Sequence, residues 1–520
     1  MRALLALAIA AGFLVGSGCD GISSNPVIDT TEGPVTGLFT DRIHSFKGIP
    51  YATPPVGELR WRAPQPPPIH AETLAAKDFG RICSQRDMPA LGHRSSDSSE
   101  DCLTLNIWTP DIENTAGLPV MVWIHGGGYV SGSSNTQRLN GAALAKKDVV
   151  LVSINYRLNA FGFFTHPAIT KAQANEAHAN YGLLDVIAAL TWVQNNVEQF
   201  GGDKNNVTIF GESAGANIVD NLLIMPQADG LYQKAISQSS SFGLAPEPDL
   251  EKRIGFLPSG DSAGKKMVER LGLSDLDDES LVPALRQLTA EQLINAVPAN
   301  ERFTPVVDRH IRPQQAGLLF GSGQFAKVPY MSGSVSWEAS LGHQIGGNFA
   351  PKNFARLIPK ADKERLYADQ QGAALEDAIF TDLIILSPTR YVANAMQNAG
   401  APVWRYHMTY VAEERRDAQP GVAHADDIAF VMQTLDKDLE QPTATDWNVS
   451  KVMSDYWVQF ARTGNPNFDG AVNWESYEAE RNNVLIFDEQ PVIEEDFFAE
   501  RMDFQNQRSY QFLLRMTGNK

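Results

Sequence analysis

The chain has 520 residues, and its 61 Asp and Glu against 43 Lys and Arg give a formal charge of −18. So acidic a chain lacks the clustered cationic charge that phosphate backbones demand, which excludes nucleic acid as the expected partner. With 43% hydrophobic and 20% charged residues, the composition is that of a folded globular protein with a large core.

Residues 1–18 are predicted to be an export signal. A short basic start and an unbroken apolar run precede Gly16-Ser17-Gly18 and Cys19. The run is too short to cross a bilayer. This order also resembles a bacterial lipoprotein signal, although Gly16 stands where Leu is usual. Two outcomes stay open: a periplasmic or cell-envelope lipoprotein tethered to a membrane through lipidated Cys19, or a secreted protein released by an ordinary cut.

After the signal we expect a short tether, 19–26, and one domain over 27–520. If Cys19 carries lipid, Cys83 and Cys102 remain as an even pair. Cysteine pairs in exported proteins commonly form disulfides, and two free buried thiols are the alternative. The oligomeric state is left open.

Short runs broken by glycine, 34–39 and 44–49, predict an antiparallel edge, and the proline-rich stretch 51–68 predicts a surface loop. A helix is expected over 181–200, ended by Gly201-Gly202. Because the buried runs alternate with helices, the sequence predicts an α/β class with a large, mostly parallel sheet covered on both faces. The expected buried strands are 103–108, 120–124, 149–154, 207–210, 235–237 and 328–331.

Two helix-rich stretches, 250–325 and 345–400, follow or interrupt these strands. They include charged amphipathic segments such as 352–376. Periodicity does not distinguish a cap over the sheet, fixed or mobile, from ordinary helical packing.

The pattern Gly-x-Ser-x-Gly occurs twice, around Ser213 and around Ser262. A nucleophile elbow needs a strand that ends in a tight turn and is followed at once by a helix. Ser213 has this context, between the strand 207–210 and a helical stretch from 214. Ser262 precedes an amphipathic segment and is predicted to cap a helix. Ser213 is therefore the candidate nucleophile.

A serine nucleophile needs a base to take its proton and N–H donors to hold the oxyanion that forms. Three glycines, 126–128, directly follow the strand 120–124, and glycine leaves backbone amides open to a cavity. A plain loop is the alternative for a glycine triplet alone. We expect the N–H groups of Gly127, Gly128 and Ala214 to form the oxyanion hole.

The segments 100–110 (EDCLTLNIWTP), 200–203 (FGGD) and 210–215 (FGESAG) together resemble the type-B carboxylesterase family, which includes the cholinesterases and bacterial para-nitrobenzyl esterases. The segments 48–52 (GIPYA) and 180–185 (NYGLLD) extend the resemblance over essentially the whole mature chain. It implies an α/β-hydrolase fold with helical, cap-like insertions.

The same resemblance implies roles for individual residues. The family's disulfide loop maps onto Cys83 and Cys102, whereas its second disulfide has no cysteines here. Glu212 and Ser239 would support the base and the acid. Arg60 with Glu100, and Arg157 with Asp185, look like the family's structural ion pairs, with solvated charges as the alternative.

Chain order in α/β-hydrolases is serine, acid, histidine, so the base must follow Ser213. His424 matches the family's catalytic histidine, although Ala425 replaces the usual glycine after it. His407 is expected to pack inside a strand and His310 to lie in a solvated turn.

The acid must orient the imidazole and stabilise its charged form. Glu338 resembles the family's catalytic glutamate, although Val335 and Trp337 replace its customary Asn and acidic neighbours. Asp308 is the rival, while Asp426 and Asp427 follow the histidine and break the order.

The sequence thus predicts an exported serine carboxylesterase that acts through an acyl-enzyme on a small-molecule ester. One alternative is a specialised hydrolase of a bulky natural, polymer-derived or toxin ester, and another is a non-catalytic binding or adhesion homologue. No metal or cofactor is implied, since metal-ligand, phosphate-binding and dinucleotide motifs are missing. Trp337, Phe242 and Phe349 are candidate pocket linings, with core packing as the alternative.

Overall fold

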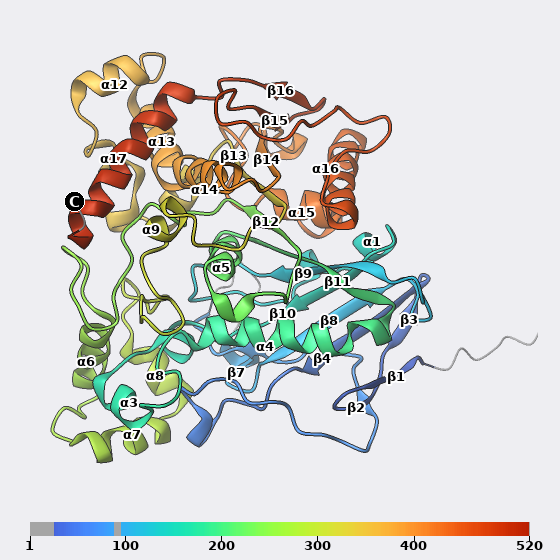
Figure 1. Ribbon diagram of the computed structural model, residues 1–520, viewed down its shortest axis with the longest axis vertical. Helices are drawn as coiled ribbons and strands as arrows, with labels where there is room; N and C mark the ends of the chain where they lie inside the picture. Colours follow the sequence, from blue (N-terminus) through green and yellow to red (C-terminus); the bar gives the residue numbers. More distant parts are fainter. Residues whose placement is uncertain (1–24, 88–94, 519–520) are drawn as a thin grey trace, which may run out of the picture.

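The computed structural model describes residues 25–87 and 95–518. The predicted signal, Cys19 and most of the expected tether lie outside these ranges. An 11-stranded sheet runs through the protein, and helices lie on both of its faces (Figure 1). The predicted α/β class is therefore confirmed.

The strands from β10 to β15 run parallel, and antiparallel strands complete both edges. Across the sheet the order is β16 (Val492–Glu494), β15 (Val484–Phe487), β14 (Val403–Met408), β13 (Tyr330–Val335), β12 (Lys234–Gln238), β11 (Gly202–Glu212), β9 (Leu118–Ile124), β10 (Val150–Ile154), β8 (Thr104–Thr109), β4 (Ile43–Pro50) and β3 (Leu38–Thr40). A second sheet holds β1 (Val27–Thr30), β2 (Gly33–Thr36) and β5 (Leu74–Ala75), and a third holds β6 (Ile82–Cys83) and β7 (Ser98–Ser99).

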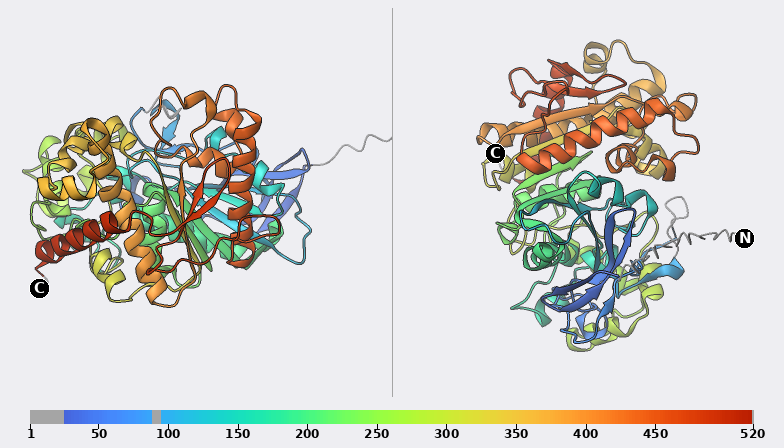
Figure 2. Two further views of the ribbon diagram at one scale, coloured as in Figure 1. Left: turned by 90° about the horizontal axis from the view of Figure 1, so that it is seen from above. Right: turned by 90° about the vertical axis from the view of Figure 1, so that its right-hand side faces the viewer.

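Successive side chains of the central strands point to opposite faces of the sheet, and both faces are buried. Val120, Val122 and Ile124 of β9 join one apolar cluster with residues of α4 and α5, whereas Met121 and Trp123 join the other with residues of α16. The sheet therefore lies between two helical layers (Figure 2).

The helices differ widely in length. They are α1 (Ala142–Ala145), α2 (Asn159–Phe163), α3 (Pro167–Ala172), α4 (Tyr181–Asn196), α5 (Ala214–Leu223), α6 (Gly260–Arg270), α7 (Asp278–Gln287), α8 (Ala290–Ala296), α9 (Ala316–Gly321), α10 (Ala339–Ile345), α11 (Pro351–Ala355), α12 (Lys360–Leu366), α13 (Gly372–Thr381), α14 (Ser387–Asn398), α15 (Asp427–Met432), α16 (Ala444–Thr463) and α17 (Ala499–Thr517). The charged segment 352–376 is thus divided among α11, α12 and α13.

One expected strand begins later than predicted, and one predicted helix cap is wrong. The strand expected at 328–331 is β13, which begins only at Tyr330, because Pro329 has no N–H to donate to a neighbouring strand. Ser262 does not cap α6. The cap is Ser259, whose Oγ accepts a hydrogen bond from the Ser262 N–H at 3.1 Å. Ser262 therefore lies in the first turn of a helix and not at a strand end.

Both expected ion pairs are formed and largely buried, so the solvated alternative is wrong. Arg60 Nε lies 2.7 Å from Glu100 Oε2. Arg157 binds Asp185 with two guanidinium contacts of 2.7 and 2.8 Å, and Asp185 is fully buried. The second pair joins the loop after β10 to helix α4.

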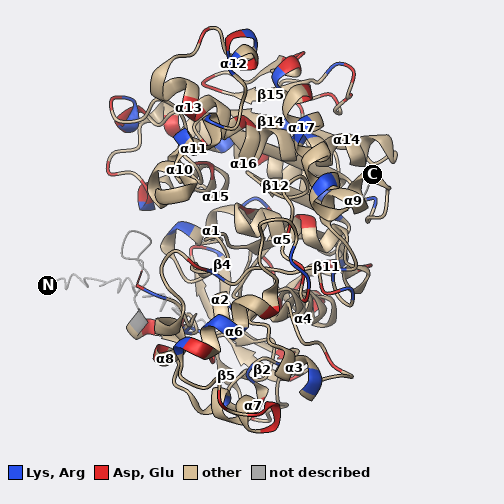
Figure 3. Cartoon of the chain, turned by 90° about the vertical axis from the view of Figure 1, so that its left-hand side faces the viewer, with Lys and Arg blue, Asp and Glu red and all other residues tan. Residues whose placement is uncertain are grey.

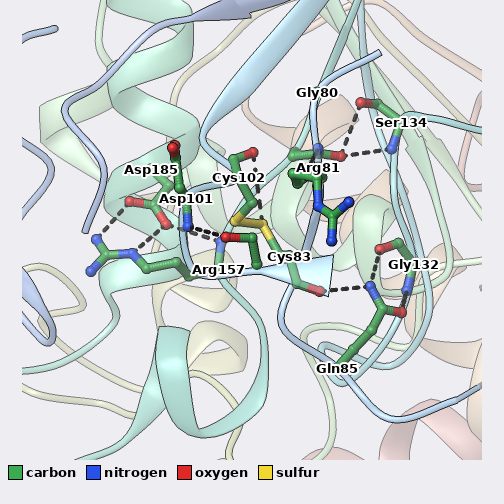
Figure 4. Close-up of a disulfide and its surroundings, with 12 residues drawn as sticks. Gly80, Arg81, Cys83, Gln85, Asp101, Cys102, Gly132, Ser134, Arg157 and Asp185 are labelled. Carbon is green, nitrogen blue, oxygen red and sulfur yellow. Dashed lines mark hydrogen bonds and ion pairs between the residues drawn. A yellow bond between two sulfur atoms is a disulfide. The ribbon is translucent and has the colours of Figure 1, made fainter. Parts of the chain in front are cut away.

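Cys83 and Cys102 form a disulfide, which confirms that expectation over free thiols. Figure 4 shows that Gln85, two residues after Cys83, connects Cys83 to the loop that follows β9. The Gln85 amide donates to the carbonyls of Cys83 and Gly132 at 2.9 Å and accepts from Gly132 N–H at 3.0 Å. The disulfide therefore anchors a segment that touches the glycine-rich loop.

Lys and Arg residues are scattered among Asp and Glu in the face shown in Figure 3. Within the described ranges, no helix is both long and apolar enough to span a bilayer.

Replacing both cysteines, Cys83→Ser with Cys102→Ser, is expected to destabilise the protein by about 3 kcal/mol, because a bridge over a sequence separation of 19 restricts the unfolded chain. Urea unfolding with and without reductant measures the effect. The wild-type midpoint should fall on reduction, whereas the double variant should not respond. Equal midpoints for oxidised wild type and variant would contradict the prediction.

Candidate active site

Ser213 stands in a strained turn where β11 ends and α5 begins. Its φ of 56° and ψ of −122° are rare for a residue with a side chain, and such strain clusters at functional sites. The turn is also tightly packed, since a Cβ on Gly215 would lie 2.1 Å from the Ile124 carbonyl oxygen. Backbone packing thus requires glycine at positions 211 and 215 of this turn.

The glycine-rich loop after β9 packs directly on this turn. A Cβ on Gly126 would lie 2.8 Å from the Glu212 carbonyl oxygen and 3.2 Å from Ser213 Cβ. Gly127 has a φ of 103°, and a Cβ there would lie 2.1 Å from the Ser131 carbonyl oxygen, so only glycine fits. Ala214 is the first residue of α5, where backbone N–H groups have no partner within the helix.

His424 and Glu338 are joined by a hydrogen bond. His424 Nδ1 lies 2.6 Å from Glu338 Oε2. The other Glu338 oxygen accepts from Ser239 Oγ at 2.7 Å and from Val335 N–H at 2.9 Å. Glu338 is fully buried, and these donors fix its orientation toward the imidazole.

The second ring nitrogen of His424 faces Glu212, which precedes Ser213. Nε2 lies 3.1 Å from Glu212 Oε1. Within the described residues, no hydrogen bond joins Ser213 Oγ to this nitrogen. In free enzymes such bonds are often long and tighten only in the complex with substrate. The backbone N–H of His424 donates to Ser340 Oγ at 2.8 Å, which anchors the loop.

The electrostatic environment of His424 favours its protonated, imidazolium form. Burial by itself lowers the pKa of His424, but the adjacent carboxylates of Glu212 and Glu338 outweigh it and raise the pKa above its ordinary value. Burial raises the pKa of Glu212, and the nearby imidazole opposes that rise.

A third carboxyl group, that of Asp427, lies close to His424 and Glu338. Burial raises its pKa to about 6. Its Oδ2 accepts hydrogen bonds from Gln238 Nε2 at 2.8 Å and from the Tyr406 hydroxyl at 3.1 Å. Three buried carboxyl groups therefore surround one imidazole.

The rivals considered from sequence have other partners. The Asp308 side chain accepts backbone N–H groups of residues 310–312 and the Asn180 amide, so it stabilises a turn. His407 is buried in β14 with Nδ1 2.9 Å from Ser334 Oγ, and burial lowers its pKa to about 3. Asp426 pairs with Arg415 at 2.8 Å.

Sequence reasoning missed Ser340, Gln238 and Tyr406, which position His424 and Asp427. Their partners lie far away in the chain, and no local motif includes both members of a pair. Asp427 follows the histidine and so breaks the order expected for the acid. Its place three residues after His424, at the start of an apolar segment, was the available signal.

The candidate pocket linings have defined neighbours. Trp337 Nε1 donates to Asp377 Oδ2 at 2.8 Å. Phe242 is buried beneath the Arg312 guanidinium. Phe349 packs edge-on against Phe354 and Phe380 with centroids 5.5 and 5.2 Å away, as in a small aromatic core.

The described residues contain no group of three or more His, Cys, Asp or Glu side chains arranged to hold a metal ion. The chemistry that this site offers from its own residues is nucleophilic and acid–base: a serine in a strained turn, an imidazole bound to a carboxylate, and backbone N–H groups of a glycine-rich loop.

Known proteins are similar to this chain over most of its length. The model of the carboxylesterase family matches residues 24–368 and 361–505. A fumonisin B1 esterase from Sphingopyxis macrogoltabida is 33% identical over 93% of this chain and 91% of its own length. The para-nitrobenzyl esterase of Bacillus subtilis is 34% identical over 92% of this chain and 98% of its own.

Solved structures of similar enzymes have the same fold. A para-nitrobenzyl esterase structure covers 92% of this chain and 99% of its own, with a TM-score of 0.79 and 31% identity. The Geobacillus stearothermophilus carboxylesterase EST55 at pH 6.2 covers 93% of this chain and 100% of its own, with a TM-score of 0.78 and 29% identity. The predicted α/β-hydrolase fold is thereby confirmed, and the chain belongs to the carboxylesterase family.

Proposed function

We propose that this protein hydrolyses carboxylic esters with Ser213 as nucleophile, His424 as base and Glu338 as the acid that orients it. The observation that carries the proposal is the strained Ser213 turn together with the 2.6 Å bond between His424 and Glu338. A non-catalytic homologue would be expected to lack one of these groups or an oxyanion glycine, and all are present.

The reaction has two balanced steps. Ser213 Oγ forms a bond to the ester carbonyl carbon while His424 takes its proton, and the N–H groups of Gly127, Gly128 and Ala214 hold the oxyanion. The bond to the alkoxy oxygen then breaks, and His424 gives that oxygen the proton. Water next adds to the acyl carbon while His424 takes its proton. The acyl–Oγ bond then breaks, His424 returns the proton to Ser213 Oγ, and the carboxylic acid is released.

The names of the similar enzymes cover quite different esters: fumonisin B1, para-nitrobenzyl esters and, for a mouse relative 30% identical to this chain, pyrethroids. They support the ester bond as the common target. The specialised hydrolase of a bulky ester is one form of the same proposal, since Ser213, His424 and Glu338 would act in the same way.

Replacing Ser213 tests the nucleophile. We expect Ser213→Ala to lower kcat/KM for p-nitrophenyl acetate by about 10⁴-fold or more, because acyl transfer loses its acceptor. Ser262→Ala, in the second Gly-x-Ser-x-Gly pattern, is the matched control and should retain wild-type rates. Hydrolysis by Ser213→Ala at the wild-type rate would refute the proposal.

Glu212 controls the protonation of the base. His424 acts as a base only when it is neutral. Because the neighbouring carboxylates raise its pKa, kcat/KM should rise with pH along a limb whose midpoint lies above 6.5, the ordinary pKa of histidine. Glu212→Gln removes one carboxylate and should move that limb to lower pH. The exposed Glu198→Gln is the control. A limb that stays in place, or moves to higher pH, in Glu212→Gln would contradict this assignment.

We further propose that the protein is exported, with 1–18 as the signal and Cys19 as the lipid acceptor. The Cys83–Cys102 disulfide supports export, because disulfides persist in oxidising compartments. Mass spectrometry of the mature N-terminus after expression in a Gram-negative host is expected to find an acylated Cys19. An unmodified N-terminus near residue 19 would instead indicate secretion, and a retained Met1 would contradict export.

A further inference from the structure

One arginine lies beside the glycine-rich loop. Among the described residues, and leaving out those that adjoin Gly128, the one heavy atom within 4 Å of a Cβ added at Gly128 is Arg302 Nη1, at 3.8 Å. Gly127 differs, since its own Cβ position is filled by the Ser131 carbonyl. The Arg302 guanidinium therefore lies beside Gly128, the expected oxyanion donor.

Two hydrogen bonds connect the backbone next to Arg302 with the backbone next to Gly128. Asn159 N–H donates to the carbonyl of Tyr129, the residue after Gly128, at 2.7 Å. Asn159 Oδ1 accepts from the N–H of Phe303, the residue after Arg302, at 2.9 Å. Phe303 is itself buried and packs edge-on against Phe164 with centroids 5.5 Å apart. The backbone of Arg302 is therefore fixed relative to the glycine-rich loop.

Within the part of the chain that the structure describes, no acidic side chain pairs with Arg302. Its side chain is exposed and has no hydrogen bond or ion pair to any residue in 25–87 or 95–518. The adjacent Glu301 is occupied, because it pairs with Arg270 at 2.6 Å. A guanidinium presents a planar set of donors that matches a carboxylate in geometry as well as charge.

The reaction geometry determines which part of the substrate reaches Arg302. The leaving alcohol must contact His424, which lies between Glu212 and Glu338. The carbonyl oxygen must lie at the N–H groups of Gly127 and Gly128. An acyl substituent that extends past Gly128 would then meet the Arg302 guanidinium, which lies beside that residue.

We propose that Arg302 binds a carboxylate on the acyl part of the substrate, so that half-esters of dicarboxylic acids are preferred. The proposal rests on the function proposed for Ser213 and adds a substrate class to it. Arg302 would determine specificity, while the bonds made and broken at the ester remain those described above.

The test compares two methyl esters of equal shape. One is monomethyl glutarate, and in the other an isopropyl group replaces the free carboxylate. Acid release in a pH-stat gives kcat/KM for each ester. The ratio compared is kcat/KM for monomethyl glutarate divided by kcat/KM for the isopropyl ester. We expect Arg302→Met to lower that ratio about 10- to 100-fold, the usual effect of losing one charge-assisted hydrogen bond. Arg302→Lys should retain part of it.

Two controls separate local binding from general charge. Arg309→Met removes another exposed arginine, one paired with Asp249, and should leave the ratio unchanged. The acetate ester of γ-hydroxybutyrate carries its carboxylate on the alcohol, and its hydrolysis should not depend on Arg302. Added salt should lower the ratio in wild type and have less effect in Arg302→Met.

The outcomes separate this proposal from the proposed function. If Ser213→Ala is inactive but Arg302→Met keeps the wild-type ratio, the acyl-carboxylate proposal is wrong and the esterase assignment stands. Wild type that does not hydrolyse monomethyl glutarate, or an Arg302 effect confined to the alcohol-side carboxylate, would also overturn it. If Ser213→Ala retains wild-type activity, the esterase assignment itself fails.

Discussion

The buried contact between the His424 imidazole and the Glu338 carboxylate is the interaction on which the site depends. A carboxylate so deeply buried is costly unless its oxygens are satisfied. Here Ser239, the Val335 N–H and the imidazole supply the partners. The same contact that compensates the buried charge also orients the His424 ring, with Nε2 directed toward Glu212, the residue before Ser213.

The sheet brings these groups together although they are distant in the chain. Gly127 follows β9, Ser213 follows β11, Glu338 follows β13, and His424 lies in the connection after β14. Because these strands are parallel, their carboxyl ends lie at one edge, where α/β proteins commonly bind ligands. The packing at Gly126 and Gly215 shows how closely the loops approach there, so the geometry follows from backbone packing as well as from side-chain pairing.

The sequence predicted best what is encoded locally. The strand, tight turn and helix around Ser213 are contiguous, and so are β9 and the glycines after it. The pairing of Cys83 with Cys102 followed from counting cysteines. The bonds from Ser340 to His424 and from Gln238 to Asp427 could not be predicted, because each joins segments brought together only by the sheet. Arg302 was missed for the same reason: its proximity to Gly128 depends on Asn159, a residue in neither segment.

Covalent labelling tests the central claim most directly. A fluorophosphonate probe reacts with a serine only when a base and an oxyanion site activate it. Peptide mass spectrometry after labelling should find the phosphonyl group on Ser213, with labelling strongly reduced in His424→Ala. A label on Ser262, or equal labelling of Ser213 without His424, would contradict the account.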